Sequence, residues 1–130
     1  MPVVASLLAA SMIVAQPASR QFDLACTELA HSGRASVPEY RFRIDLDQNR
    51  WCEGTCDRPQ EIVAVTADRY TLVSNDYRGR TLRTASNSYI DRVSGEHFEQ
   101  NVSIGATTQI DSRRGRCERA PYSGMPSPRL

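Results

Sequence analysis

Four cysteines constrain the fold of this 130-residue chain more than any other feature. They stand at Cys26, Cys52, Cys56 and Cys117, all beyond an apolar segment near the N-terminus. An even number of cysteines in a small domain is typical of a disulfide framework formed in an oxidising compartment. The spacing predicts a short loop closed by Cys52 and Cys56, and a long loop closed by Cys26 and Cys117. The long-range bond would join the two ends of the folded region.

A zinc site made of all four cysteines is the alternative, because three residues separate Cys52 from Cys56, as in many pairs of metal ligands. Zinc binds thiolates, whereas the cysteines of exported proteins are usually oxidised. A redox-active pair is disfavoured, since the spacing is not Cys-x-x-Cys and no thioredoxin-like pattern surrounds it. We therefore expect two disulfides, with no metal and no other cofactor.

The run from residue 3 to residue 15 is uncharged and mostly apolar. A membrane-spanning helix needs about 20 apolar residues, so a stable membrane anchor is not expected. Small residues close the run, which predicts a signal peptide over residues 1–15 with cleavage after Ala15. Because no Lys or Arg precedes the run, a buried N-terminal helix is the alternative. Together with the cysteines, the run predicts an exported protein, periplasmic or secreted.

The rest of the chain is long enough for one domain. We expect a single β domain over residues 16–120 and a Pro-rich extended tail over residues 121–130. The tail contains three prolines, which lack the N–H donor that a central strand needs. It should therefore be extended, either loose or laid across the sheet.

All 16 basic residues are arginines, and 15 acidic residues balance them to a net charge of +1. The absence of lysine excludes a Schiff-base lysine and a P-loop lysine. A nearly neutral domain also argues against nucleic-acid binding, which normally requires a clearly basic surface.

Apolar and charged residues alternate strictly from residue 40 to residue 46, which predicts a strand with one face on a core and the other in water. Two runs rich in β-branched residues, 61–66 and 69–74, meet at Ala67-Asp68, as in a tight hairpin. Further strands are predicted at residues 22–26, 88–93, 97–104 and 109–118, with a turn at Ser94-Gly95. Within 97–104, Phe98, Val102 and Ile104 share one side of the strand.

No segment shows a convincing helical stripe. Short strands at spacings of roughly ten residues, about six to eight in all, predict an all-β fold. We expect an antiparallel meander that forms a small barrel or a strongly curled sheet. Closing the sheet would remove edge strands that invite aggregation.

Residues 45–49 resemble the first oxygen ligands of a calcium loop, but Arg50 stands where the loop requires glycine and Cys56 where it requires glutamate. An Asp/Asn-rich turn after a strand is therefore the preferred interpretation. Trp51, the single tryptophan, lies beside Cys52 and should belong to the core. Arg113, Arg114 and Arg116 are interpreted as ordinary surface, because acidic residues are interspersed with the arginines.

His31 and His97 are isolated in sequence and are expected at the surface, since neither lies in a His-x-x-x-His or Glu-x-x-His arrangement. Either could still act as a ligand or a base. Residues that could supply a carboxylate to such a site are Asp23, Asp45, Asp91 and Glu99.

Several segments together resemble small exported proteins of alphaproteobacteria that carry no assigned function. These are residues 22–26, residues 40–52 with their Asp-Leu-Asp and Arg-Trp-Cys elements, residues 91–95, and Gly115-Arg116-Cys117. The resemblance covers nearly the whole chain after the leader and implies no catalytic residue, since its motifs are strands, turns and cysteines. The general plan is also similar to small periplasmic β-barrel inhibitors of lysozymes and proteases, in architecture alone.

The leading hypothesis is a non-enzymatic binding or inhibitory module of the cell envelope, because the chain is small, β-rich and disulfide-bonded and has no recognisable catalytic set. Its partner would be an unknown protein or small molecule of the envelope. One alternative is a small hydrolase or metal-dependent enzyme whose site is assembled from His31, His97 and strand carboxylates. A structural envelope protein is the other alternative.

Overall fold

The computed structural model describes Val3 and residues 19–126. The predicted signal peptide therefore lies outside the described residues except for Val3, and so do the last four residues of the tail. Secondary structure in the described part consists of strands and turns, without a helix. Accordingly, no helix among these residues is long and apolar enough to cross a membrane.

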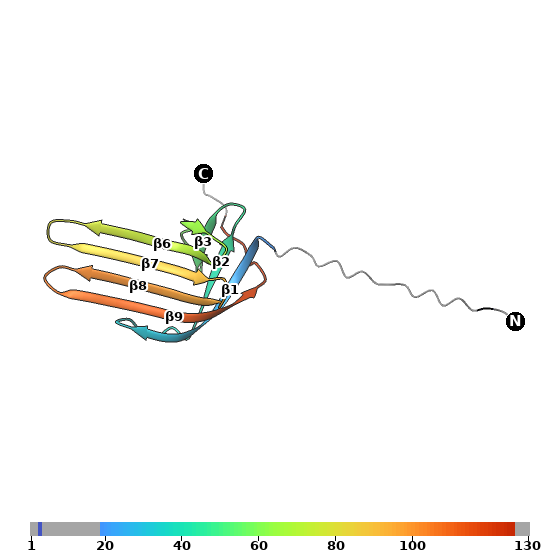
Figure 1. Ribbon diagram of the computed structural model, residues 1–130, viewed down its shortest axis with the longest axis horizontal. Coiled ribbons are helices and arrows are strands. Elements are labelled where there is room, and N and C mark those ends of the chain that lie inside the picture. The colour runs from blue at the N-terminus through green and yellow to red at the C-terminus, as the bar shows by residue number, and fades with distance from the viewer. Residues whose placement is uncertain (1–2, 4–18, 127–130) are drawn as a thin grey trace.

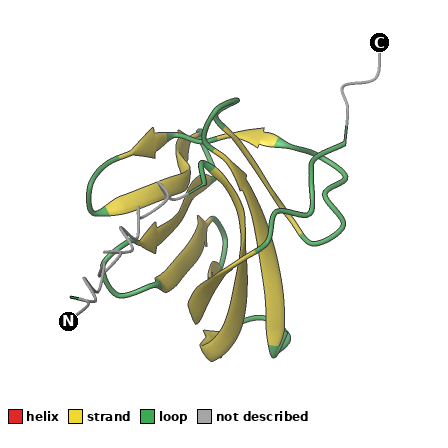
Figure 2. Cartoon of the chain, turned by 90° about the vertical axis from the view of Figure 1, so that its right-hand side faces the viewer, coloured by secondary structure: helices red, strands yellow, loops and turns green. Residues whose placement is uncertain are grey.

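Nine antiparallel strands form one sheet, in the order β4-β3-β2-β1-β9-β8-β7-β6-β5. The strands are β1 (Gln21–Ser32), β2 (Glu39–Asp45), β3 (Arg50–Glu53), β4 (Gln60–Glu61), β5 (Ala64–Val65), β6 (Arg69–Arg78), β7 (Arg83–Asp91), β8 (Glu96–Ile104) and β9 (Thr108–Ala120). The sheet curls strongly into a half-barrel (Figures 1 and 2), which confirms the predicted all-β fold. There are nine strands rather than six to eight because the strand predicted at residues 61–66 is divided into β4 and β5, and because β3 is not among the predicted strands.

One short segment forms both edges of the sheet. β4 pairs with β3 and β5 pairs with β6, and two residues, Ile62 and Val63, separate these edge strands in the chain. The Ile62 amide donates to the Asn49 carbonyl at 3.0 Å, and the Val63 amide donates to the Thr71 carbonyl at 2.9 Å. The Ile62 side chain is buried. The segment therefore bridges the two edges of the half-barrel at its packed end.

The core lies at one end of the curled sheet, inside its concave face. The alternation in β2 places Tyr40, Phe42 and Ile44 in this core, as the sequence predicts. Tyr70, Leu72 and Ile90 pack from the opposite side of the curl. Burial of large apolar side chains at this end is the main source of stability, since each contributes about 1.5–3 kcal/mol.

Both disulfides have the connectivity that the spacing predicts. Cys26 on β1 and Cys117 on β9 lie directly opposite each other in the sheet, with Cα atoms 4.0 Å apart. Cys52 and Cys56 close the loop after β3. None of the four cysteines is free to hold zinc.

The far parts of β6–β9 extend beyond this core as a four-stranded sheet, visible at the left of Figure 1. We call residues 74–87 and 100–112 the distal blade. None of its residues is buried. The blade is formed by two long hairpins, and both β6 and β7 run further than the sequence pattern predicts.

The tail lies across the outer face of β1 and β2. The Ser123 amide and hydroxyl both donate to the Asp23 carboxylate, at 3.1 and 2.6 Å. Arg43 donates to the Gly124 carbonyl at 2.8 Å. Of the two predicted arrangements of the tail, the structure therefore has the one laid across the sheet, as far as Gly124.

Candidate binding site

A hollow of about 600 Å³ opens on the concave side of the sheet, where the packed core meets the distal blade. Its walls come from the β1–β2 loop, from β3 and the loop after it, and from the inner faces of β8 and β9. Trp51 and Asn101 contribute to the lining. The other main contributors are charged and of both signs, namely Arg34, Arg58, Arg113, Glu53, Asp57 and Glu99.

The floor of the hollow is an ion-pair network centred on the buried side chain of Arg113. Its guanidinium donates to Glu53 at 2.6 Å and to Glu99, its register partner on β8, at 3.2 Å. Arg34 also pairs with Glu99. The Arg113 guanidinium carbon lies 4.0 Å from the centre of the Tyr40 ring, a cation–π contact. Although burial opposes its charge, these carboxylates hold the pKa of Arg113 above its usual value.

Beneath this floor, His97 is fully buried between two hydroxyl groups. Its Nδ1 atom lies 2.8 Å from the Tyr40 hydroxyl and its Nε2 atom 3.0 Å from the Ser88 hydroxyl. Burial, assisted by the positive charges of Arg113 and Arg34, lowers the pKa of His97 from 6.5 to about 3. Burial also raises the pKa of Tyr40 to about 12. At neutral pH the imidazole and the phenol are therefore both uncharged.

Two buried N–H groups of the lining have no hydrogen-bond partner among the described residues, the indole Nε1 of Trp51 and the Nε of Arg113. Both groups are donors and cannot accept. Buried polar groups are almost always hydrogen-bonded, to protein or to water. Both donors belong to side chains that line the hollow, although neither nitrogen atom is itself exposed in the single chain.

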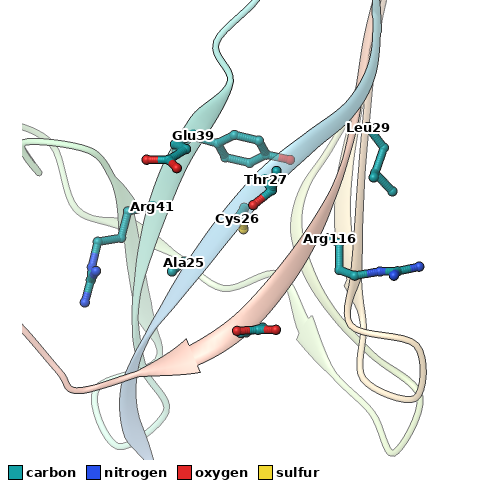
Figure 3. A pocket seen from close by; sticks show the side chains of 9 residues that line it. Ala25, Cys26, Thr27, Leu29, Glu39, Arg41 and Arg116 are labelled. Carbon is teal, nitrogen blue, oxygen red and sulfur yellow. The ribbon is translucent and has the colours of Figure 1, made fainter.

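A second depression, of about 560 Å³, lies on the outer face of β1 (Figure 3). Small exposed residues, Ala25 and Thr27, form its base. Each of them has an arginine on one neighbouring strand and a glutamate on the other: Arg41 and Glu118 flank Ala25, while Arg116 and Glu39 flank Thr27. Alternating charges around small residues are typical of a solvated sheet face. The concave hollow is the better candidate because the charged side chain at its centre, Arg113, is buried.

The structure corrects the expectation that both histidines are surface residues. His31 is exposed and pairs with Glu28 at 2.8 Å, but His97 is fully buried. His97 faces inward because it occupies the inner register of β8, opposite Ile90 and Gly115. Among the described residues, no three or more His, Cys, Asp or Glu side chains are grouped so that they could hold a metal ion.

Three of the four carboxylates considered from the sequence accept hydrogen bonds that stabilise turns or hold the tail, and they do not line the hollow. Asp45 accepts hydrogen bonds from the Asp47 and Gln48 amides, so this segment forms the Asp/Asn-rich turn and not a calcium loop. Asp91 accepts from two amides of the turn that contains Gly95, whose φ is 77°. Asp23 lies beneath the tail. Burial would raise its pKa, but hydrogen bonds from Ser123 and Arg41 outweigh burial and lower it.

Glu99 is the one carboxylate of this group that lines the hollow. Interpreting Arg113 as ordinary surface is wrong, because its side chain is only 2% exposed. A signal for this was present in the sequence: Arg113 lies four residues before Cys117, so both face the same side of β9. Trp51 is buried as expected, and its ring packs edge-on against Phe42.

Comparison with known proteins gave no match to any protein-family model, to any curated protein or to any solved structure. The resemblance to small exported proteins therefore stays a prediction.

Proposed function

We propose that this protein is a non-enzymatic binding or inhibitory module of the cell envelope, and that the concave hollow receives its partner. The observation that carries the proposal is the ion-pair network at the base of an open hollow, in which the Arg113 side chain is buried between Glu53 and Glu99. Burying charges is costly and seldom the most stable solution for a core. A preformed polar surface within a hollow is, however, what specific recognition requires.

The Ser88–His97 pair supports binding rather than hydrolysis. A nucleophilic serine needs access to substrate and a base that accepts its proton near neutral pH. Ser88 is 2% exposed and His97 is fully buried. With a pKa of about 3, His97 would also be a weak base. These properties fit a structural role for the pair beneath the site.

The loop beside the hollow suits contact with a protein partner. The Cys52–Cys56 bond closes it, and Glu53, Gly54 and Thr55 are exposed between these cysteines. A short loop held by a disulfide loses little conformational entropy when it binds. Its position next to the hollow would let one partner contact both. The two disulfides also favour an oxidising compartment, which is consistent with export.

Capture from an envelope extract by the immobilised protein tests the proposal. We expect Arg58→Glu, at the exposed rim of the hollow, to reduce capture of the partner strongly. Arg80→Glu, in the exposed turn between β6 and β7, is the matched control and should bind normally. Trp51 is the only tryptophan and lines the hollow, so partner binding should also change its fluorescence.

The proposal fails if the wild-type protein retains no envelope component and no small ligand raises its melting temperature. It also fails if Arg58→Glu and Arg80→Glu capture the partner equally well while both remain folded.

A further inference from the structure

β6 leaves most of one edge unpaired. β5 pairs with Tyr70 and Thr71 alone, so no strand of the described part of the chain lies beside residues 72–78 on that side. The residues from Ser74 to Arg78 are all exposed. An open edge of this kind presents unpaired backbone N–H and C=O groups to any strand that approaches it.

The hairpin turn determines which backbone groups point outward. The Gly79 amide donates to the Leu82 carbonyl at 2.7 Å, so Gly79 faces β7. Backbone direction alternates along a strand. Tyr77 and Asn75 therefore also face β7, whereas Ser74, Asp76 and Arg78 direct their N–H and C=O groups to the open side.

The open edge is complementary in charge to a second copy of itself. When two such edges run antiparallel with Tyr77 opposite Tyr77, Asp76 of each copy lies opposite Arg78 of the other. Both residues have outward backbone groups, so this register also aligns donors with acceptors. Within one chain, Asp76 already lies 3.7 Å from Arg78 and from Arg83, which places these three side chains on one face of the blade.

Tyr77 favours the same register. It is 61% exposed in the single chain, and its side chain lies on the opposite face from Asp76 and Arg78. In the two-fold arrangement the Tyr77 residues form a non-hydrogen-bonded pair, the closer of the two pair types in an antiparallel sheet. Aromatic pairs at such positions stabilise strand pairing.

We propose that two copies of this protein associate edge to edge through residues 76–78 of β6, forming one continuous sheet across a two-fold axis. The contact is isologous: each Asp76 pairs with the other copy's Arg78, and the two tyrosines meet at the axis. The contact lies on the distal blade and does not involve the concave hollow. The proposed dimer can therefore be tested independently of the proposed binding function.

Sedimentation velocity at several protein concentrations tests the proposal with a set of charge variants. Asp76→Arg places one arginine opposite Arg78 at each of the two contacts, and Arg78→Asp places one aspartate opposite Asp76 at each, so each variant should weaken the dimer about tenfold or more. The double variant Asp76→Arg/Arg78→Asp restores both pairs and should dimerise like the wild type. An equimolar mixture of the two single variants should form a heterodimer more readily than either variant alone self-associates.

The positions are exposed, and circular dichroism with thermal unfolding would verify that each variant folds. Arg114→Asp, an exposed charge change on β9 away from the open edge, should leave the dimer unchanged. A wild-type protein that stays monomeric at every concentration would overturn the proposal. So would a dimer that neither single variant weakens, or a mixture that pairs no better than its components.

Discussion

The two ends of strands β6–β9 have the same antiparallel backbone pairing but differ in the burial of their side chains. At the packed end, Tyr70, Leu72 and Ile90 are buried in the core and Cys117 is bonded to Cys26. At the distal blade the same strands continue to pair, β6 and β7 after a one-residue shift in register between Thr71 and Val73, yet no residue is buried. Strand formation in this protein thus continues well beyond the part that has a core.

This difference in burial shows that the packed end, and not the blade, provides most of the stability of the domain. A two-stranded hairpin alone is marginal in water, and extra strands with an apolar face are what stabilise a sheet. The blade has four strands but depends on the packed end to hold them together. Substitutions at the packed end should therefore destabilise the whole domain, whereas the blade should tolerate change and remain available for contacts.

Removing the Cys26–Cys117 bond should have the largest effect on stability. In a chain-entropy estimate a loop of this length stabilises the folded state by about 4–5 kcal/mol, whereas a loop as short as that of Cys52–Cys56 contributes about 2 kcal/mol. The sequence separations are 91 and 4. Denaturant unfolding of Cys26→Ala/Cys117→Ala and of Cys52→Ala/Cys56→Ala would measure both losses. An equal loss from both pairs would contradict the idea that β1–β9 closure organises the packed end.

Truncating equivalent isoleucines at the two ends should give the next largest difference. Ile90 is 2% exposed in β7, whereas Ile110 is 51% exposed in the blade part of β9. We expect Ile90→Ala to lower the free energy of unfolding by about 2–5 kcal/mol, through lost burial and a cavity. Ile110→Ala should change it by about 0.5 kcal/mol or less. A comparable loss at both positions would mean that the blade contributes directly to the core.

The alternation of apolar and charged residues was sufficient to predict β2 at the packed end, whereas β3 was not predicted as a strand. In β2 every second side chain is buried, and this regularity is what a period-two pattern detects. The lengths of β6 and β7 in the blade were underestimated because a period-two pattern detects only strands that have one apolar face. Ser74–Arg78 and Arg83–Asn87 carry polar residues on both faces, so backbone pairing extends β6 and β7 without a signal in hydrophobicity.

The candidate site was harder to predict because its residues are polar but face inward. His97 and Arg113 occupy core-facing registers, where apolar residues are expected. Their burial depends on partners contributed by distant segments, Tyr40 from β2 and Glu53 from the end of β3. Register counted from the disulfide at Cys117 would have indicated the direction of Arg113, but not its partners.

The glycines of β9 and of the blade give a further contrast. A Cβ atom on Gly115 would lie 2.0 Å from the Tyr40 hydroxyl oxygen and 3.0 Å from the Thr27 carbonyl oxygen. Gly115→Ala should therefore destabilise the domain by about 1–3 kcal/mol, because the core would have to rearrange. On Gly105, at the tip of the blade, the nearest atom would be 3.5 Å away. Gly105→Ala, the matched control, should unfold at nearly the wild-type denaturant concentration; a loss like that of Gly115→Ala would show a packed tip.

The last prediction concerns the pH dependence of stability that is due to His97. The change in the free energy of unfolding is small for each pH unit, but it is specific to the candidate site. In the unfolded chain His97 has its ordinary pKa of 6.5, whereas in the folded protein its pKa is about 3. Between these values the unfolded state binds more protons, so acid favours unfolding. The free energy of unfolding should fall by up to about 1.4 kcal/mol for each pH unit below 6.5, until pH approaches 3.

Replacing His97 by glutamine separates this contribution from that of the carboxylates. Asp23 also has a lowered pKa, but its ordinary value is 3.8, so it contributes to acid unfolding mainly below pH 4. Denaturant unfolding of the wild type and of His97→Gln between pH 4.5 and 6.5 should therefore show a steep decline in the wild type and a flatter one in the variant. Parallel declines would mean that His97 becomes protonated in the folded state as readily as in the unfolded chain. In that case water would reach His97 beneath the floor of the hollow. The packed end would then not be as dry as the contrast with the solvated blade implies.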